Sequence, residues 1–195
     1  MSEKDKIQFD KMLAFHSAPT ILGVKCANLF AVDQDDYRLS ELENYFSAKK
    51  ELCGTKIRFL CRCSRRVLAF VYHEQLLSMW LSEQKTAEFL SEYGYGECAT
   101  IDEKLALLES RISCGSFPHE IGVFLGYPIN DVRGFIENHG ENYIFCGFYK
   151  VYSEPEKAKR TFQKYVECRD FLCDKISRGS SLGCAMAQFK EEKSL

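Results

Sequence analysis

The most chemically suggestive stretch of the sequence is FPHEIGVFLGYP, which runs from Phe117 to Pro128. It places a histidine and a glutamate, His119 and Glu120, in front of a mostly apolar run. An imidazole and a carboxylate can act together as an acid–base pair. Adjacent side chains, however, point to opposite faces of a strand, or about 100° apart on a helix, so each needs partners from elsewhere in the fold. No second histidine completes the zinc-binding pattern His-Glu-x-x-His.

A second stretch with chemical potential is HSAPTILGVKCANLF, residues 16–30. Its polar residues His16, Thr20 and Lys25 are scattered through apolar sequence. Such segments can bind an anion through backbone N–H groups and a lysine. The segment lacks the Gly-Lys-Ser/Thr order of a P-loop. The alternative is an irregular crossing of the core whose polar groups bond to the backbone.

The chain has ten cysteines, and two of them, Cys61 and Cys63, are two residues apart. On a strand these two thiols would share a face, which makes them the candidates for a thiol or metal site. Zinc needs two further ligands, and no Cys-x-x-Cys or His-x-x-x-His pattern supplies them, so no metal site is predicted. Most of the other cysteines, such as Cys146, lie in apolar sequence and are expected to pack as small hydrophobic residues.

Secondary-structure signals place these residues on a mixture of helices and strands. The arms 57–63 and 67–73 flank Ser64 and Arg65, and apolar and polar residues alternate along the first arm, which predicts an antiparallel hairpin. A helix over 3–16 should end before Pro19. Apolar spacing and turn residues predict the other elements: helices over 36–52, 74–93, 100–112, 130–139 and 153–178, a buried strand or short buried helix over 120–127, and an aromatic strand over 142–152.

Together these elements predict one α+β domain over residues 1–179, with a small, partly antiparallel sheet of about four or five strands packed with helices. Residues 180–195 contain small and then charged residues, so we expect a frayed C-terminal tail.

Composition excludes several classes of partner. The formal net charge is −2, which argues against a large basic face for nucleic acid. No apolar run approaches the roughly 20 residues of a membrane span. The N-terminal sequence MSEKDKIQFDK is charged and does not resemble a signal peptide, so we expect a cytoplasmic protein.

Two blocks resemble a known family. FHSAPTILGVKCANLF (15–30) and the long block from Phe117 to Arg169, which begins FPHEIGVFLGYP, are similar to the bacterial domain-of-unknown-function family 3793, common in anaerobic Firmicutes. The sequence departs from that pattern at Cys26, where proline is expected, and at Phe148, where tryptophan is expected. The resemblance implies a small cytoplasmic bacterial protein, and it implies no reaction or cofactor.

Because the polar residues of both stretches fall inside family motifs, we hypothesise that they meet in one pocket. The residues of this candidate site are His16, Thr20, Lys25, His119, Glu120 and Tyr127. The pocket would bind a small-molecule ligand or serve a redox-associated role. Two alternatives stay open: a non-enzymatic protein-interaction module, and a thiol- or iron-handling protein centred on Cys61 and Cys63. Whether the protein is an enzyme, and in which oligomeric state it acts, does not follow from the sequence.

Overall fold

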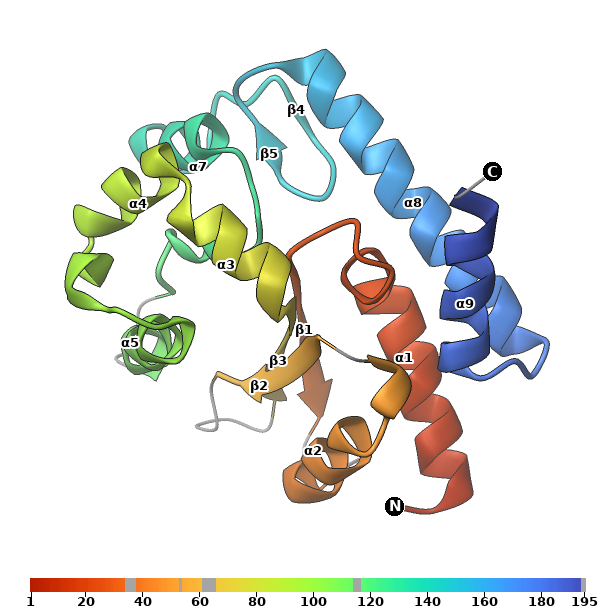
Figure 1. The fold of residues 1–195 in the computed structure, drawn as a ribbon. Helices are drawn as coiled ribbons and strands as arrows, with labels where there is room; N and C mark the ends of the chain where they lie inside the picture. The colour runs from red at the N-terminus through yellow and green to blue at the C-terminus, as the bar shows by residue number, and fades with distance from the viewer. Residues whose placement is uncertain (34–37, 53, 61–65, 114–116, 194–195) are drawn as a thin grey trace. The chain divides into compact units, whose positions relative to one another are not determined.

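The computed structural model describes residues 1–33, 38–52, 54–60, 66–113 and 117–193 (Figure 1). It confirms an α+β fold, with helices and two small antiparallel sheets. Contacts within the chain group it into two compact units. Unit 1 comprises residues 1–74 and 164–195, and unit 2 comprises residues 75–163. The expected single domain stays a prediction, and each unit is described below by itself.

Unit 1 is built on a three-stranded sheet of order β1-β3-β2. Strand β3 (Arg66–His73) is central and pairs antiparallel with β1 (Ala27–Asp33) and β2 (Thr55–Phe59). The predicted hairpin is confirmed, since Ile57 lies opposite Val71 and Phe59 lies opposite Ala69. The turn proposed at Ser64 and Arg65, with Cys61 and Cys63, lies outside the described residues.

One face of this sheet carries the core of unit 1. Residues two apart on a strand share a face, so Val67, Ala69 and Val71 of β3 project together into the core. Helix α1 (Glu3–Ile21) covers them with Phe9 and Leu13. Helix α2 (Leu39–Ser47) and the short 3-10 helix η1 (Lys50–Leu52) complete the N-terminal part of the unit.

Helix α1 is longer than predicted. The predicted helix ended near residue 16, but α1 continues to Ile21 with Pro19 inside it. Proline removes one backbone hydrogen bond to the preceding turn. Here it stands in the last turn, and its carbonyl is used after the helix ends, where it accepts from the backbone N–H groups of Val24 and Lys25 at 2.8 and 3.0 Å. Pro19 therefore lies in the last turn of α1. The helix ends at Ile21, a few residues after the end that was predicted from the proline.

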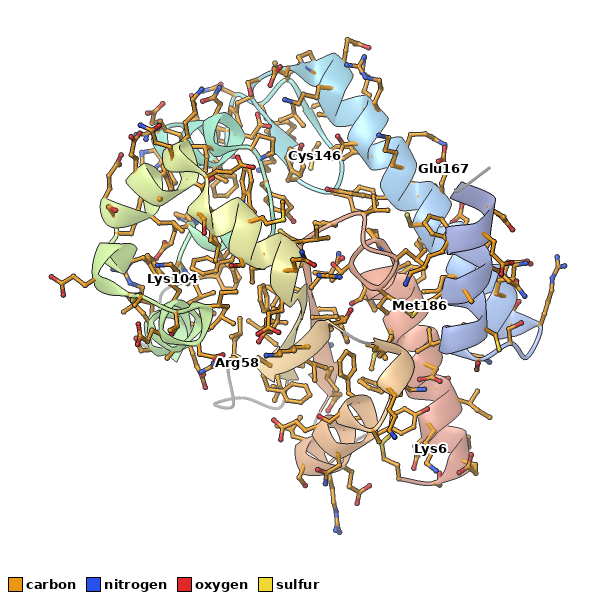
Figure 2. All side chains as sticks on the ribbon, in the orientation of Figure 1. Lys6, Arg58, Lys104, Cys146, Glu167 and Met186 are labelled. Carbon is orange, nitrogen blue, oxygen red and sulfur yellow. The ribbon has the colours of Figure 1, made fainter. Side chains whose placement is uncertain are left out.

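The C-terminal residues are also more ordered than predicted. Residues 182–193, expected to be frayed, form helix α9 (Leu182–Lys193). Its residues Leu182, Ala185, Met186 and Phe189 belong to the core of unit 1, and Figure 2 labels Met186 on this helix. These residues follow an i, i+3, i+4, i+7 pattern, which makes one apolar stripe on a helix. The charged residues in the same segment obscured this pattern.

Unit 2 is mostly helical. It begins with α3 (Glu74–Ser82) and continues through the elements α4 (Gln84–Ser91), η2 (Tyr95–Glu97), α5 (Ile101–Ser113), α6 (Ile121–Phe124) and α7 (Ile129–Glu137). The predicted helix over 74–93 is therefore divided in two at Glu83. The capping box that predicted α5 is present, because Glu103 N–H donates to Thr100 Oγ1 and Thr100 N–H donates to Glu103 Oε2.

The stretch EIGVFLGY is buried as predicted, but it is helical. Helix α6 is closed by hydrogen bonds from Val123 N–H to the Glu120 carbonyl and from Leu125 N–H to the Ile121 carbonyl, at 2.9 and 3.0 Å. A short apolar run buried on all sides looks the same whether it forms a strand or a helix. The preferred strand was wrong, and the short buried helix held as its alternative is correct.

The aromatic run over 142–152 is a hairpin rather than one strand. Strands β4 (Phe145–Cys146) and β5 (Lys150–Val151) pair antiparallel on either side of a turn that starts at Gly147. Glycine fits closely there, because a Cβ at this position would lie 2.3 Å from Phe162 Cε2 and would force that ring to move. Helix α8 (Pro155–Ser177) follows and contains the boundary between the units. The single sheet of four or five strands is therefore two sheets, of three and two strands.

Candidate functional site

A cavity of about 360 Å³ lies within unit 2. Its wall is made by the start of α6, the turn that leads into α7, α7 itself and the β4–β5 hairpin. All of its lining residues belong to unit 2: Phe117, His119, Ile121, Gly122, Leu125, Tyr127, Asp131, Val132, Phe135, Cys146, Gly147, Phe148, Tyr149 and Lys150. Two of the six predicted site residues, His119 and Tyr127, are therefore part of one cavity wall.

Close packing of α6 against α7 shapes the floor of the cavity. A Cβ at Gly122 would meet Val132 Cγ2 at 3.0 Å and Tyr127 Cδ2 at 3.2 Å, so a larger residue here would push against both side chains. Gly126 has φ +73°, a conformation that glycine adopts at little cost, and this turns the chain into α7. Gly122 and Gly126 thus place Tyr127 beside the cavity.

Asp131 connects α7 to the end of the hairpin. Its Oδ1 accepts hydrogen bonds from the backbone N–H groups of Tyr152 and Ser153, both at 2.8 Å, and from the Ser153 hydroxyl at 3.0 Å. A carboxylate oxygen that accepts three donors is well satisfied. Asp131 is therefore a structural tie between two walls of the cavity.

Aromatic rings form much of the remaining wall. The rings of Tyr127 and Tyr149 have centroids 4.5 Å apart, and Tyr149 also packs edge-on against Phe162 at 4.8 Å. The Tyr127 hydroxyl donates to the Phe148 carbonyl at 3.3 Å, which joins the turn before α7 to the hairpin. Burial raises the pKa of Tyr149, and the nearby Asp131 charge adds to this effect, so its phenol stays protonated at neutral pH.

The side chains of His119 and Lys150 also lie in this wall. The His119 ring stands edge-on to Phe135, with centroids 5.2 Å apart. The Lys150 Nζ donates to the Gly140 carbonyl at 2.6 Å, at the end of α7. The same Nζ lies 4.8 Å from the centroid of Tyr143 and 5.8 Å from that of Phe135.

Cys146 is more exposed than its apolar neighbours in the sequence suggested. It lies on strand β4 of the hairpin, where Figure 2 labels it, and it is exposed. A two-residue strand in a small hairpin covers only one side of each residue, so the thiol reaches solvent. The six described cysteines are all reduced, but only Cys26 and Cys168 are buried, while Cys184 is exposed like Cys146, so fewer of them pack in the interior than the sequence predicted.

Glu120 does not belong to the cavity wall. Its buried carboxylate accepts from Arg111 Nη1 at 2.7 Å and from the Tyr95 hydroxyl at 3.3 Å. Burial raises the pKa of Tyr95, and the Glu120 charge raises it further. The side chains of His119 and Glu120 therefore lie in different surroundings, as expected for two adjacent residues.

The other three predicted site residues lie in unit 1. The Thr20 hydroxyl donates to Asn28 Oδ1 at 2.7 Å, which links the end of α1 to β1. Lys25 is buried, and its Nζ lies 5.3 Å from the Tyr165 ring centroid. Burial lowers the pKa of Lys25 to about 8. His16 stacks on Phe30, with centroids 5.1 Å apart, and loss of hydration lowers its pKa.

The six residues of the predicted shared pocket are thus distributed over the two units. Thr20 and Lys25 flank one turn of unit 1, while His119 and Tyr127 share the cavity of unit 2. A single site containing both groups stays a prediction. The thiol pair Cys61 and Cys63 lies outside the described residues, and within those residues no group of three His, Cys, Asp or Glu side chains could hold a metal ion.

Most residues of the cavity wall were not among the predicted site residues, including the aromatic residues Phe135, Phe148 and Tyr149 and the charged Lys150. The signal that was present is the density of aromatic residues between 143 and 149. A single strand over this run would have pointed alternate rings away from each other. The turn at Gly147 instead folds the run back, which gathers the rings beside α7.

The fold and the cavity define a small α+β protein with an aromatic-walled site in its helical unit. The chain belongs to the family described as "Protein of unknown function (DUF3793)", whose model matches residues 13–185. This confirms the family resemblance of the two sequence blocks. No curated protein and no solved structure has significant similarity to the chain. Within the described residues, no helix is both long and apolar enough to cross a membrane.

Proposed function

We propose that this protein binds a small, flat, largely apolar ligand in the cavity of unit 2. The observation that carries this proposal is the cavity itself, with a volume of about 360 Å³ and a predominantly aromatic and aliphatic wall. Protein interiors leave few voids larger than a water molecule. Ligand sites, by contrast, are concave, mostly apolar and about 300–1,000 Å³ in volume.

The composition of the wall supports a flat ligand. Five aromatic side chains line the cavity: Phe117, Tyr127, Phe135, Phe148 and Tyr149. Aromatic rings pack favourably against other rings, either offset or edge to face, and each pair contributes about 0.5–1.5 kcal/mol beyond the area it buries. A planar aromatic ligand would gain several such contacts at once.

The few polar groups of the wall would orient such a ligand. His119 and Lys150 both line the cavity and offer hydrogen-bond donors. A site that combines an apolar body with one or two polar groups holds a ligand in a defined orientation. The proposal is therefore a binding function, and it assigns no reaction to these residues.

The test is a titration of the reduced protein with a library of small aromatic fragments that includes naphthalene carboxamide, observed by ligand-detected and protein-detected NMR. Phe135→Ala removes one wall of the cavity, so the Kd of bound fragments should rise about tenfold or more, a loss of about 1.4 kcal/mol. Phe171→Ala is the matched control, because Phe171 is a similarly half-buried phenylalanine that lies in unit 1. A library without binders, or equal binding by both variants, would contradict the proposal.

A protein-interaction module is the second candidate, and one observation favours it. Phe117, Tyr143, Ile144 and Phe148 of unit 2 are exposed, and two of them line the cavity. Exposed apolar patches often bind protein partners. The variant Ile144→Asp discriminates the two functions. It changes the exposed hairpin outside the cavity wall, so fragment binding should persist if the cavity is the functional site.

A further inference from the structure

We propose that the ligand of this cavity is an aromatic carboxylate, whose negative group is bound by the Lys150 ammonium. This inference rests on the proposed function, because it names the chemical class of the ligand in the same cavity. Two observations support it: the position of Lys150 in the cavity wall, and the hydrogen bonds that already occupy Oδ1 of Asp131.

Lys150 is held in place by the fold. Its backbone pairs with Cys146 in the hairpin, and its Nζ donates to the Gly140 carbonyl at 2.6 Å. The ammonium lies over the rings of Tyr143 and Phe135, at 4.8 and 5.8 Å from their centroids. A lysine ammonium has three N–H donors, and the Gly140 carbonyl accepts one of them. A positioned ammonium that also lines a cavity is suited to bind an anionic oxygen there.

Asp131 is the other charged residue in the cavity wall, and its Oδ1 is occupied by protein donors. Tyr152 N–H, Ser153 N–H and the Ser153 hydroxyl all donate to it. These donors offset its negative charge locally, so Asp131 opposes an anion less than an unbound carboxylate would. Among the described residues that line the cavity, Asp131 is the only aspartate or glutamate and Lys150 the only lysine or arginine.

A cationic ligand fits this cavity poorly. Aromatic walls bind cations through the faces of their rings. Here the protein's own ammonium already lies over the ring of Phe135, an aromatic residue of the cavity wall. A second cation nearby would be repelled by Lys150. Electrostatics therefore favour an anionic ligand over a cationic one.

A carboxylate matches the site better than a phosphate monoester. A phosphate carries up to two negative charges at neutral pH. Lys150 supplies one positive charge, and the rest of the wall is mainly apolar. The second charge of a phosphate would be desolvated without a partner, which is costly. A planar aromatic body with a single carboxylate satisfies both the rings and the ammonium.

The experiment compares two ligands of nearly identical shape, naphthalene carboxylate and naphthalene carboxamide, by calorimetric titration. The wild-type protein should bind the carboxylate about five- to tenfold more tightly. In Lys150→Met this ratio of affinities should fall to one or below, while Lys150→Arg should keep most of it because the charge remains. Lys159→Met is the matched control, since Lys159 is an exposed lysine of unit 2 outside the cavity wall, and it should leave the ratio unchanged.

The ratio of the two affinities separates the inference from the proposed function. If Lys150→Met damages the cavity, both ligands lose affinity together and the ratio stays at its wild-type value, which overturns the inference. A wild-type ratio of one or less, with the carboxamide still bound, overturns the inference and leaves the binding function standing. Binding of neither ligand counts against both.

Discussion

Neighbouring residues in this chain serve unrelated purposes, as His119 and Glu120 illustrate. His119 lies in the cavity wall beside Phe135, while Glu120 is 3% exposed and bonded to Arg111 and Tyr95. Arg111 also donates to the Tyr93 carbonyl at 2.6 Å. The ion pair therefore anchors the start of α6 to α5 and to the segment before η2. A buried ion pair of this kind is costly to break, because the remaining charge loses its partner.

The first prediction concerns that pair. Arg111→Met should destabilise the protein by about 2 kcal/mol, because it leaves the Glu120 carboxylate and the Tyr93 carbonyl without their donor. The partial exposure of Arg111 keeps the value at the lower end, since water can replace some of its contacts. Urea denaturation measures the change. Arg178→Met removes an exposed pair with Asp174 and should cost at most about 0.5 kcal/mol. Equal costs for the two variants would show that the buried pair has no special weight.

The second prediction concerns Lys25, whose pKa is lowered by burial from 10.5 to about 8. Below about pH 8 the lysine is protonated in both states, so the folded state carries the full cost of burying the charge. Between about pH 8 and 10.5 the folded state releases the proton and the unfolded state keeps it. This part of the free energy of unfolding therefore increases as the pH rises, by up to about 3 kcal/mol.

Lys25→Met removes this dependence. The stability of the parent relative to Lys25→Met should therefore rise between about pH 8 and pH 10, measured by urea denaturation under reducing conditions. Both chains should also carry Cys26→Ala, because burial raises the pKa of that thiol to about 11 and its titration would overlap. A difference that stays constant with pH would show that Lys25 has an ordinary pKa.

At the scale of single elements, α7 and the hairpin depend on glycines that secondary-structure propensity disfavours. Gly134 lies in the middle of α7, where alanine would normally be preferred by about 1 kcal/mol. A Cβ at this position would lie 2.6 Å from Tyr152 Cγ and 2.7 Å from Tyr152 Cβ. The close approach of α7 to the end of β5 thus outweighs the preference of the helix.

The third prediction follows from this contact. Gly134→Ala should destabilise the protein by about 1–3 kcal/mol, because Tyr152 must move to make room for the methyl group. Thermal denaturation measures the change, and Glu137→Ala, at an exposed position of the same helix, should change stability by at most about 0.5 kcal/mol. A more stable Gly134→Ala variant would mean that helix propensity, and not packing, decides this position.

The elements were predictable where the signal is local. The alternating arm 57–63 and the Thr100–Glu103 capping box each predicted an element that the structure contains. α6 was ambiguous because a fully apolar run has no periodicity. The hairpin at Gly147 was missed because the residue that packs against this glycine, Phe162, comes from α8 and approaches only in the folded chain. The same difference between local and long-range signals explains which residues of the candidate site could be predicted. His119 and Tyr127 stand in a polar-apolar motif, whereas Phe135 and Lys150 become its neighbours only through folding.

At the scale of the whole molecule, contacts divide the chain into two compact units, each with its own fully buried leucines. The core of unit 1 includes Leu182 of α9, which is fully buried, and unit 2 contains the fully buried Leu105 of α5. Leucine to alanine changes at such positions typically cost about 2–5 kcal/mol, because they remove apolar contacts and leave a cavity.

The fourth prediction uses these two residues as a reciprocal pair. Leu182→Ala should accelerate hydrogen exchange most in peptides of residues 1–74 and 164–193, while Leu105→Ala should do so most in peptides of residues 75–163. The reason is that amides are exposed by opening of the unit to which they belong. Peptide-resolved mass spectrometry measures both patterns. Equal acceleration in both units by each variant would instead support the single domain expected from the sequence.

The order of the two units along the chain has a consequence for how the protein is made. Unit 2 is one continuous stretch, and unit 1 is assembled from the two stretches that flank it. A ribosome releases a chain from its N-terminus, so residues 1–74 emerge first and then wait while all of unit 2 is synthesised. During that time α1 and the sheet lack the apolar stripe of α9 that covers part of their core. The unit that begins first is therefore completed last, and its apolar core stays partly uncovered until α9 has left the ribosome.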